Sequence, residues 1–356
     1  MSVGLLAVLL LVGAGPTVGE DRAGGGLKRF EFQETHMGSA FRLLIYCNDE
    51  ELASGAARAA FARIALLDAT LSDYKPDSEL MRLSDRAGGD PVPVSPELFE
   101  VLARSRELSG RTDGAFDVTI NPVVKLWRRA RRNRELPSRS QLDEALSRVG
   151  WRDLELDAQA RTVRLARPGM RLDVGGIAKG YASDAALAEL RGAGITRALV
   201  AGAGDIVVGD PPPGRPGWRV GIASADAEAG ERRMLCLRNQ AVSTSGDAER
   251  FVEIEGVRYS HIVDPRTGLG LTGRSSVTVV APDGTTSDSL ATAISVLGPD
   301  RGLALAEDTE GAEALIVAIE PGQNQYEIRR TPGFDRWLTG PAEGDEPVPS
   351  LGPPES

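Results

Sequence analysis

The chain has 356 residues, of which 41% are hydrophobic, so it can bury a large core in one large domain or two smaller ones. Its 51 Asp and Glu residues outnumber its 41 Lys and Arg residues, and the net charge is −10. This acidic balance argues against a surface built for nucleic-acid backbones. A bound polyphosphate would need local cations or a metal ion to offset the charge of the protein.

The N-terminus has the pattern of an export signal. An apolar run from Val3 to Val12 precedes small residues, has the length of a signal-peptide core and is too short to span a bilayer. No Lys or Arg precedes the run, and no cysteine directly follows it to carry a lipid. We therefore expect residues 1–24 to be a signal peptide or N-terminal export segment and the protein to be exported.

Periodicity predicts the first structured elements. Residues 41–47 alternate as a strand, and residues 57–71 follow as a helix because their apolar side chains recur at three- and four-residue steps. Pro76 ends that periodicity, and a second helix is expected over 96–108 with Ser95 as its N-cap. The strand places four side chains on one face: Phe41, Leu43, Ile45 and Cys47.

The second half of the chain is rich in strands. The basic run 127–134 is expected to be the solvated face of a helix, and another helix is expected over 181–191. Few helices among many strands indicate an α+β fold with largely antiparallel sheet, in a single domain over 28–338. The Pro-, Gly- and acid-rich segment 339–356 is expected to be a disordered tail. The predicted strands are 161–166, 198–202, 218–223, 252–256, 275–281 and 313–320.

A glycine turn at 171–185, RLDVGGIAKGYASDA, sets an acid, two glycines and a lysine where a strand-like run gives way to a helix. Glycines let backbone approach a ligand closely, and the first N–H groups of a helix favour an anion such as phosphate. The spacing is neither GxGxxG nor GxxxxGK[ST], so neither standard nucleotide motif applies. An ordinary strand-to-helix connection is the alternative.

Asp288 and Thr292 stand four residues apart in a helical pattern, so a carboxylate and a hydroxyl would share one face. Hard oxygens of this kind suit magnesium, which takes few protein ligands plus substrate phosphates. The alternative is purely structural: Asp288 would be an acid at the N-terminus of a helix and Thr292 an interior threonine.

His261 lies between a strand-like segment and the turn signal of Asp264 and Pro265. With His36 as the other histidine, any imidazole base is one of two residues, although a lone histidine is more often a packing or capping residue. The segment 242–250, VSTSGDAER, offers hydroxyls beside a glycine as a nonspecific anion site.

The two cysteines, Cys47 and Cys236, either pair in an oxidising compartment or stay as two buried thiols, and the second alternative is favoured. The two histidines and two cysteines are too widely spaced to suggest a structural zinc site. The GxSxG, HExxH and CxxC motifs of hydrolases, zincins and redox proteins do not occur.

Eight blocks in order resemble the ApbE family, the FAD:protein FMN transferases, from about residue 30 to 335. The blocks are MGSAFRLLIY, LSDYKPDSEL, GAFDVTINPVVKLW, LDVGGIAKGYASD, AGAGDIVVG, VSTSGDAERF, YSHIVDPRTG and SDSLATAISVLG. The resemblance implies an ApbE-like, T-fold-related domain. It also implies a magnesium-dependent enzyme that splits FAD, releases AMP and leaves FMN esterified to a threonine or serine hydroxyl of an acceptor flavoprotein, such as a subunit of a membrane redox complex.

The resemblance also implies site residues. Magnesium would be held by Asp288, Thr292 and the carbonyl of Gly176, and His261 matches the family's base. A periplasmic location or attachment to the outer face of the inner membrane fits an exported member. The FAD-binding positions would be Met37, Tyr74, Ala115, Phe116, Asp117, Asp173, Lys179 and Ile262.

The chain departs from the family at Ala203, which replaces the first glycine of the common GGD motif, so the flavin fit is in question there. Two alternative functions share the motifs: a pyrophosphatase that passes FMN to water, and a noncatalytic protein that binds FAD and leaves it intact. The presence of Asp288, Thr292 and His261 argues against the noncatalytic alternative.

Overall fold

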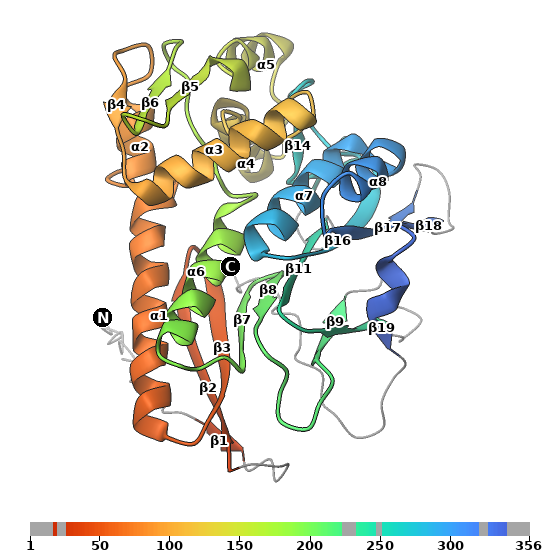
Figure 1. Ribbon diagram of the computed structural model, residues 1–356. Coiled ribbons are helices and arrows are strands. Elements are labelled where there is room, and N and C mark those ends of the chain that lie inside the picture. The colour runs from red at the N-terminus through yellow and green to blue at the C-terminus, as the bar shows by residue number, and fades with distance from the viewer. Residues whose placement is uncertain (1–16, 20–25, 223–232, 247–250, 320–326, 340–356) are drawn as a thin grey trace, which may run out of the picture.

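A nine-stranded sheet organises the molecule (Figure 1). The computed structural model describes residues 17–19, 26–222, 233–246, 251–319 and 327–339. Each neighbouring pair of strands in this sheet is antiparallel. In spatial order the strands are β1 (Thr17–Gly19), β2 (Lys28–His36), β3 (Ser39–Cys47), β7 (Ala198–Gly202), β8 (Asp205–Val208), β11 (Gln240–Gly246), β16 (Arg274–Ala281), β17 (Glu313–Ile319) and β18 (Glu327–Arg330).

Helices cover one face of the sheet: α1 (Glu50–Leu71), α6 (Ala178–Gly192), α7 (Gly284–Leu297) and α8 (Pro299–Glu307). The apolar stripe of α1 is buried against this face, as its three- and four-residue spacing predicts. The predicted face of β3 is also confirmed, since Phe41, Leu43, Ile45 and Cys47 are all buried there. This layer contains the larger core of the protein.

The other face of the sheet is buried as well. A three-stranded sheet of β9 (Trp218–Ile222), β10 (Arg233–Leu237) and β19 (Leu338–Thr339) packs on it, together with the short helix η3 (Phe334–Trp337). Leu44 of β3 therefore points into a second core and is 1% exposed, although simple alternation had assigned only its neighbours to a core. Two apolar layers stabilise the central sheet.

The remaining elements lie largely at one end of the molecule, the top of Figure 1. The hairpin β12–β13 packs with α4 and α5 in a third, smaller core. The elements are α2 (Glu79–Ser84), α3 (Pro96–Arg111), α4 (Asn121–Asn133), α5 (Arg139–Leu146), η1 (Trp151–Asp153), β4 (Val92–Pro93), β5 (Leu154–Asp157), β6 (Thr162–Leu165), β12 (Phe251–Ile254), β13 (Val257–Ser260), β14 (Val263–Asp264) and β15 (Leu269–Gly270).

The helices and strands predicted from sequence all occur, most of them with shifted ends, while the strand 198–202 has the predicted bounds. α3 starts at Pro96, and the Ser95 hydroxyl caps it by accepting from the backbone N–H of Leu98. The proposed tail is wrong at its first residue, because Thr339 pairs with Met234 in the second sheet. Residues 340–356 lie outside the described part of the chain, as do 223 and 320 at the ends of two predicted strands.

The predicted export segment falls mostly outside the described residues, which include only 17–19 of it. Those three residues pair with β2 at the edge of the large sheet. Within the described residues, none of the helices combines the length and apolar character needed to cross a membrane.

Candidate functional site

A cavity of about 950 Å³ brings together every residue proposed from sequence for the site. Its walls come from the end of α1, the start of α6, and parts of α4, β8, β11 and α7. The proposed residues come from six separate parts of the chain and share this one cavity, while their chemical roles remain predictions. The twelve proposed residues are Met37, Tyr74, Ala115, Phe116, Asp117, Asp173, Gly176, Lys179, His261, Ile262, Asp288 and Thr292.

Asp288 is a buried carboxylate in the second turn of α7. It is 3% exposed, and its Oδ2 accepts a hydrogen bond of 3.0 Å from the N–H of Gly180 near the start of α6. The alternative that Asp288 is an acid at the N-terminus of its own helix is wrong in its placement, because α7 begins at Gly284 and is capped by Asp283. The anion that α6 receives at its N-terminus in this structure is Asp288 itself.

Lys179 and Asp205 complete a charged cluster around Asp288. The ammonium of Lys179 lies 2.6 Å from Oδ2 of Asp205, which is 3% exposed at the start of β8. Burial raises the pKa of Asp288 to about 7, the negative charge of Asp205 adds to this effect, and Lys179 opposes it. Two buried carboxylates thus share one lysine.

Sequence reasoning did not select Asp205. Asp205 is visible in the sequence as the acid that directly follows the glycine in AGAGDI. Nothing in that block indicates which side chain it contacts. The hairpin between β7 and β8 carries Asp205 to Lys179, 26 residues away in the chain.

The oxygen groups proposed for magnesium lie together. A Cβ added at Gly176 would come within 2.9 Å of Oγ1 of Thr292, so backbone and hydroxyl are in close approach. Thr292 follows Asp288 by one turn of α7. A carboxylate, a hydroxyl and a backbone carbonyl form the kind of oxygen donor set that suits magnesium. No group of three or more His, Cys, Asp or Glu side chains suited to a metal ion occurs among the described residues.

Asp184 of α6 holds the start of α7 in place. Its carboxylate accepts from the N–H of Gly284 at 2.7 Å, and from the N–H and hydroxyl of Thr285 at 2.8 and 2.6 Å. The two helices touch at glycines, since a Cβ on Gly180 would lie 2.0 Å from the carbonyl oxygen of Gly284. This close contact sets the position of Asp288 relative to α6.

Replacing Asp184 with Ala should lower the free energy of unfolding by about 2–4 kcal/mol, because the buried N–H groups of Gly284 and Thr285 would lose their carboxyl acceptor. Burial raises the pKa of Asp184 to about 6, above its ordinary 3.8. The stability that this carboxyl provides is therefore greatest below pH ~4 and falls as the pH rises through 6. Urea unfolding should show a larger gap between wild type and Asp184→Asn at pH 5 than at pH 7.5, and an equal gap would contradict the assigned shift.

Arg128 connects two acids and an aromatic ring at the mouth of the cavity. Its guanidinium lies 2.6 Å from Asp73 and 3.4 Å from Asp173, and stands 4.2 Å from the ring centroid of Tyr74. Tyr74 is 75% exposed, so one side of its ring is held and the rest faces outward. Burial raises the pKa of Asp173 to about 6, and the nearby charge of Asp73 contributes.

The prediction for the basic run 127–134 is therefore only partly right. Arg128 and Arg131 line the cavity, while Trp127 is buried and donates from its indole N–H to the carbonyl of Gly268. Anchoring Trp127 fixes the rotation of α4, and helical geometry then turns the next residue toward the cavity. The number of charges along the sequence does not indicate which side chains of the helix face the cavity.

The Asp117 carboxylate accepts hydrogen bonds from neighbouring groups of the protein. It accepts from the N–H and hydroxyl of Thr119 and from the N–H of Trp151. This bracing fixes the turn in which Ala115 and Phe116 line the cavity. A ligand would therefore meet this turn mainly through its backbone and its neighbouring side chains.

His261 lies in the link between β13 and β14 and is half-buried on the cavity wall. The link is held by a hydrogen bond of 3.1 Å from the N–H of Ile262 to the Ser260 hydroxyl. The predicted turn follows, with the Asp264 carboxylate bound by the backbone and guanidinium of Arg266. An imidazole on an anchored link is well placed to face a bound substrate.

Comparison with known proteins identifies the family. The model of the ApbE family matches residues 37–316. The chain belongs to the ApbE family. It is 33% identical over 292 residues to an FAD:protein FMN transferase of Klebsiella pneumoniae, covering 81% of this chain and 89% of the relative. A Treponema pallidum relative of the same name is also 33% identical, over 88% of this chain and 90% of its own.

Solved ApbE structures share the fold. Flavin Transferase ApbE from Vibrio cholerae superposes with a TM-score of 0.78 at 26% identity, over 88% of this chain and 100% of its own. The apo flavinyl transferase ApbE of Pseudomonas stutzeri gives 0.78 at 30% identity, over 89% and 98%. The predicted α+β fold with antiparallel sheets is confirmed.

The departure from the ApbE motif at Ala203 lies in the β7–β8 turn. Ala203 has φ of +57°, in the left-handed region that glycine adopts more easily. The positive φ explains why the family commonly has glycine at this position. The Ala203 side chain borders the cavity beside Asp205. The fold accommodates the methyl group.

The serines and threonines of 242–250 do not form the suggested anion turn over the described part. Residues 242–246 belong to β11, and Thr244, Ser245 and Gly246 line the cavity from the sheet. Residues 247–250 lie outside the described part. Cys47 and Cys236 are free thiols, as favoured from sequence, but only Cys47 is buried.

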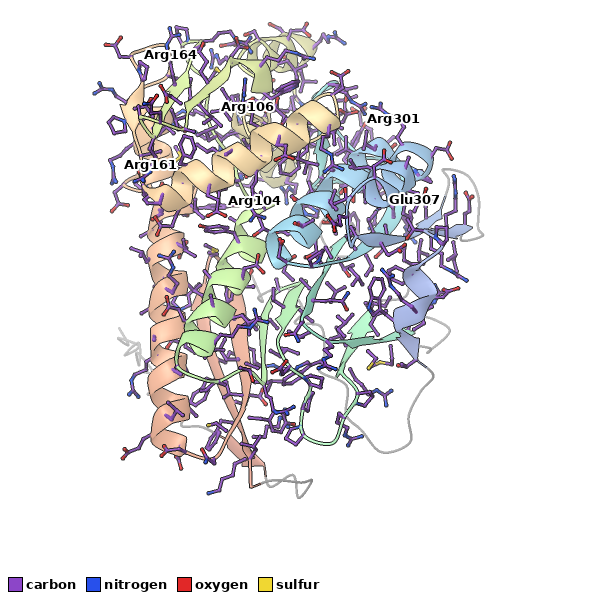
Figure 2. The ribbon with its side chains drawn as sticks, in the orientation of Figure 1. Arg104, Arg106, Arg161, Arg164, Arg301 and Glu307 are labelled. Atoms are coloured by element: carbon purple, nitrogen blue, oxygen red, sulfur yellow. The ribbon has the colours of Figure 1, made fainter. Side chains whose placement is uncertain are left out.

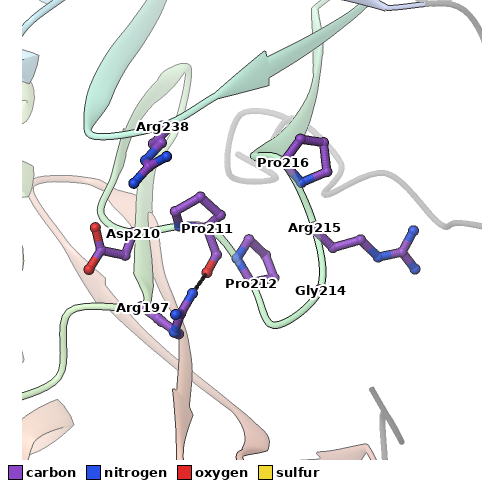
Figure 3. A pocket seen from close by; sticks show the side chains of 8 residues that line it. All are labelled: Arg197, Asp210, Pro211, Pro212, Gly214, Arg215, Pro216 and Arg238. Atoms are coloured by element: carbon purple, nitrogen blue, oxygen red, sulfur yellow. Dashed lines mark hydrogen bonds between the residues drawn. The ribbon is translucent and has the colours of Figure 1, made fainter. Parts of the chain in front are cut away.

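A second hollow of about 360 Å³ lies beside the Pro211–Pro216 loop, away from the predicted site residues (Figure 3). Arg197 donates to the Pro211 carbonyl, and Asn239 donates 3.0 Å to the Asp210 carboxylate. Because these polar groups bond within the chain, we assign no ligand to this ApbE surface.

Proposed function

We propose that this chain transfers the FMN moiety of FAD to a threonine or serine hydroxyl of an acceptor flavoprotein and releases AMP. Its relatives named FAD:protein FMN transferase support flavin transfer. The observation that carries the proposal is the cluster of Lys179, Asp205 and Asp288, together with Thr292, inside a cavity that is large and has an aromatic ring at its mouth.

In the proposed reaction, the acceptor hydroxyl oxygen forms a bond to the FMN phosphorus. The bond between that phosphorus and the bridging oxygen breaks, and the bridging oxygen leaves with AMP. His261 takes the proton of the hydroxyl as its oxygen attacks. Tyr74 and Phe116 are suited to contact flat rings, and Asp173 to accept hydrogen bonds from the ligand.

Magnesium would be held by Asp288, Thr292 and the carbonyl of Gly176. It would neutralise charge on the phosphate oxygens, as hard cations do in phosphoryl transfer. The donor set fits because all three groups offer oxygen and lie on adjoining backbone segments. Burial, and then the charge of Asp205, raise the pKa of Asp288, and a dication held there would favour the ionised carboxylate.

The deciding experiment incubates the full chain with FAD and magnesium, with and without a candidate acceptor, and measures AMP, free FMN and protein-bound flavin. Transfer predicts AMP in step with protein-bound flavin. A pyrophosphatase would give AMP and free FMN regardless of acceptor. A noncatalytic FAD-binding protein would give none of the products.

Replacing Lys179 with Ala should weaken FAD binding by about 1–3 kcal/mol, the contribution of a charge-assisted hydrogen bond. Because Asp205 would lose its cation, the control is the double variant Lys179→Ala with Asp205→Asn, which removes the unpaired buried charge. Calorimetric titration with FAD should show weak binding in both variants. Wild-type affinity in the double variant would show that Lys179 serves Asp205 and not the pyrophosphate.

We also propose that the protein acts outside the cytoplasm, in the periplasm or at the outer face of the inner membrane, on an acceptor such as a subunit of a membrane redox complex. The apolar run at 3–12 supports export. Fractionation of cells that carry the full chain with a C-terminal tag tests this. Recovery in the cytoplasmic fraction alone would contradict it.

A further inference from the structure

The exposed side of α4 carries a row of cations, Lys125, Arg129 and Arg132, which we call the basic face of α4. All three side chains are exposed. Lys125 precedes Arg128 by three residues, and Arg132 follows Arg128 by four. Lys125, Arg128 and Arg132 therefore lie along one line of the helix. Since Arg128 lines the cavity, the basic face of α4 continues the cavity wall outward to the surface.

These cations are not balanced by nearby acids. None of the three forms an ion pair with a carboxylate of the described residues. Although Lys125 is exposed, the partial burial of its ammonium group, and then the charges of Arg171 and Arg128, lower its pKa. Asp73 and Asp85 oppose this effect, but each lies 2.6 Å from an arginine, Arg128 and Arg171 respectively. Uncompensated positive charge is thus concentrated on one surface of a chain with net charge −10.

We propose that the basic face of α4 docks the acceptor protein by binding acidic side chains near its acceptor hydroxyl. This rests on the proposed transfer function, in which a macromolecule must reach a cavity that also holds FAD. Cations beside the mouth would attract and orient an acidic segment while its hydroxyl enters. An acidic acceptor would otherwise be repelled by the overall charge of the enzyme.

A membrane surface is the other polyanion that such a face could meet. Helices that lie on membranes expose an apolar side together with their cations. The apolar side of α4 is instead buried, through Val123, Trp127 and Ala130, in the third core. No α4 side chain is among the exposed large apolar residues of the described chain. The composition of this face therefore favours a protein partner.

The test uses the full chain and two fluorescein-labelled peptides, each with one Thr flanked by either Glu or Gln residues. Fluorescence anisotropy at low and at physiological salt gives their affinities. The variant Lys125→Gln, Arg129→Gln, Arg132→Gln removes the basic face of α4. The matched control removes three exposed arginines that do not line the cavity: Arg58→Gln on α1, Arg106→Gln on α3 and Arg301→Gln on α8. Figure 2 labels Arg106 and Arg301.

Wild type and control should bind the Glu peptide about 5- to 30-fold more tightly than the Gln peptide at low salt, and the basic-face variant should lose this preference. Equal binding of both peptides by wild type, or an unchanged preference in the basic-face variant, would overturn the proposal. The same proteins are also tested for binding to phosphatidylglycerol vesicles. If wild type does not discriminate between the peptides, and the basic-face variant loses vesicle binding that wild type shows, the face meets a membrane and the proposal is overturned.

Measurements on wild type and the two variants distinguish a failure of the docking proposal from a failure of the transferase proposal on which it rests. FAD binding and acceptor-free AMP release are expected to be unchanged in the basic-face variant, because none of its three residues lines the cavity. Peptide discrimination without any flavin transfer to a protein acceptor would refute the transferase proposal alone. Transfer without peptide discrimination would refute the docking proposal alone.

Discussion

Asp288→Asn should abolish AMP release from FAD at ordinary magnesium concentrations and leave the fold intact. The amide oxygen of Asn can still accept the hydrogen bond from Gly180, so the contact between α6 and α7 survives. The negative ligand is lost, and a hard dication with few protein ligands binds weakly without it. A loss of about 1,000-fold or more in rate follows if this charge positions the metal in the transition state.

Stability provides an independent readout for this variant. The folded pKa of Asp288 is about 7 against an ordinary 3.8, so ionising the buried carboxyl costs stability as the pH rises toward and through 7. Metal-free Asp288→Asn should therefore melt no lower than metal-free wild type at pH 8. Thermal melts without magnesium check this, and a collapsed fold would invalidate the kinetic comparison.

A matched control lies on the same helix. Asp283 caps α7, lines no part of the cavity, and accepts from the N–H of Thr286 at 2.8 Å. Asn caps helices nearly as well as Asp, so Asp283→Asn should keep both stability and activity. If Asp288→Asn retains the wild-type magnesium dependence of AMP release, magnesium is bound elsewhere. Recovery only at high magnesium would place Asp288 among the ligands.

His261→Ala should slow flavin transfer by about 100- to 10,000-fold, the usual contribution of a general base, and change FAD affinity little. The imidazole is proposed to act on the acceptor hydroxyl and not on FAD, so binding and chemistry should separate. Calorimetry with FAD and a time course of protein-bound flavin measure the two quantities on the same preparation.

The second histidine serves as the control. His36 ends β2, pairs with Glu34 at 2.9 Å, stacks on Phe61 and does not line the cavity. His36→Ala removes the stacking on Phe61 but no group from the cavity, so its transfer rate should stay near that of wild type. A His261→Ala enzyme that transfers flavin at the wild-type rate would remove histidine from the mechanism.

Much of the fold was predictable because periodicity is local. The helix at 57–71 and the strand at 41–47 follow from the spacing of apolar residues, and the structure confirms both. The second apolar layer was not predictable, because Leu44 belongs to a core that it shares with Trp218 and Phe334, which are distant in sequence. Alternation identifies the side of a strand that is certainly apolar, but what packs on the other side depends on the whole chain.

The candidate site divides in the same way. The four-residue spacing of Asp288 and Thr292 by itself determined that they share a helix face, since one helical turn brings them together wherever the helix lies. The resemblance of the sequence blocks to the ApbE family likewise implied the twelve cavity residues. Only the tertiary structure decided that Asp205 lies beside Lys179, that Gly180 donates to Asp288 and that Arg128 faces inward. Those contacts depend on how the packed helices and the β7–β8 hairpin are placed in space. Burial and charged neighbours that are distant in sequence then set the pKa of each carboxylate, and a local sequence pattern cannot predict them.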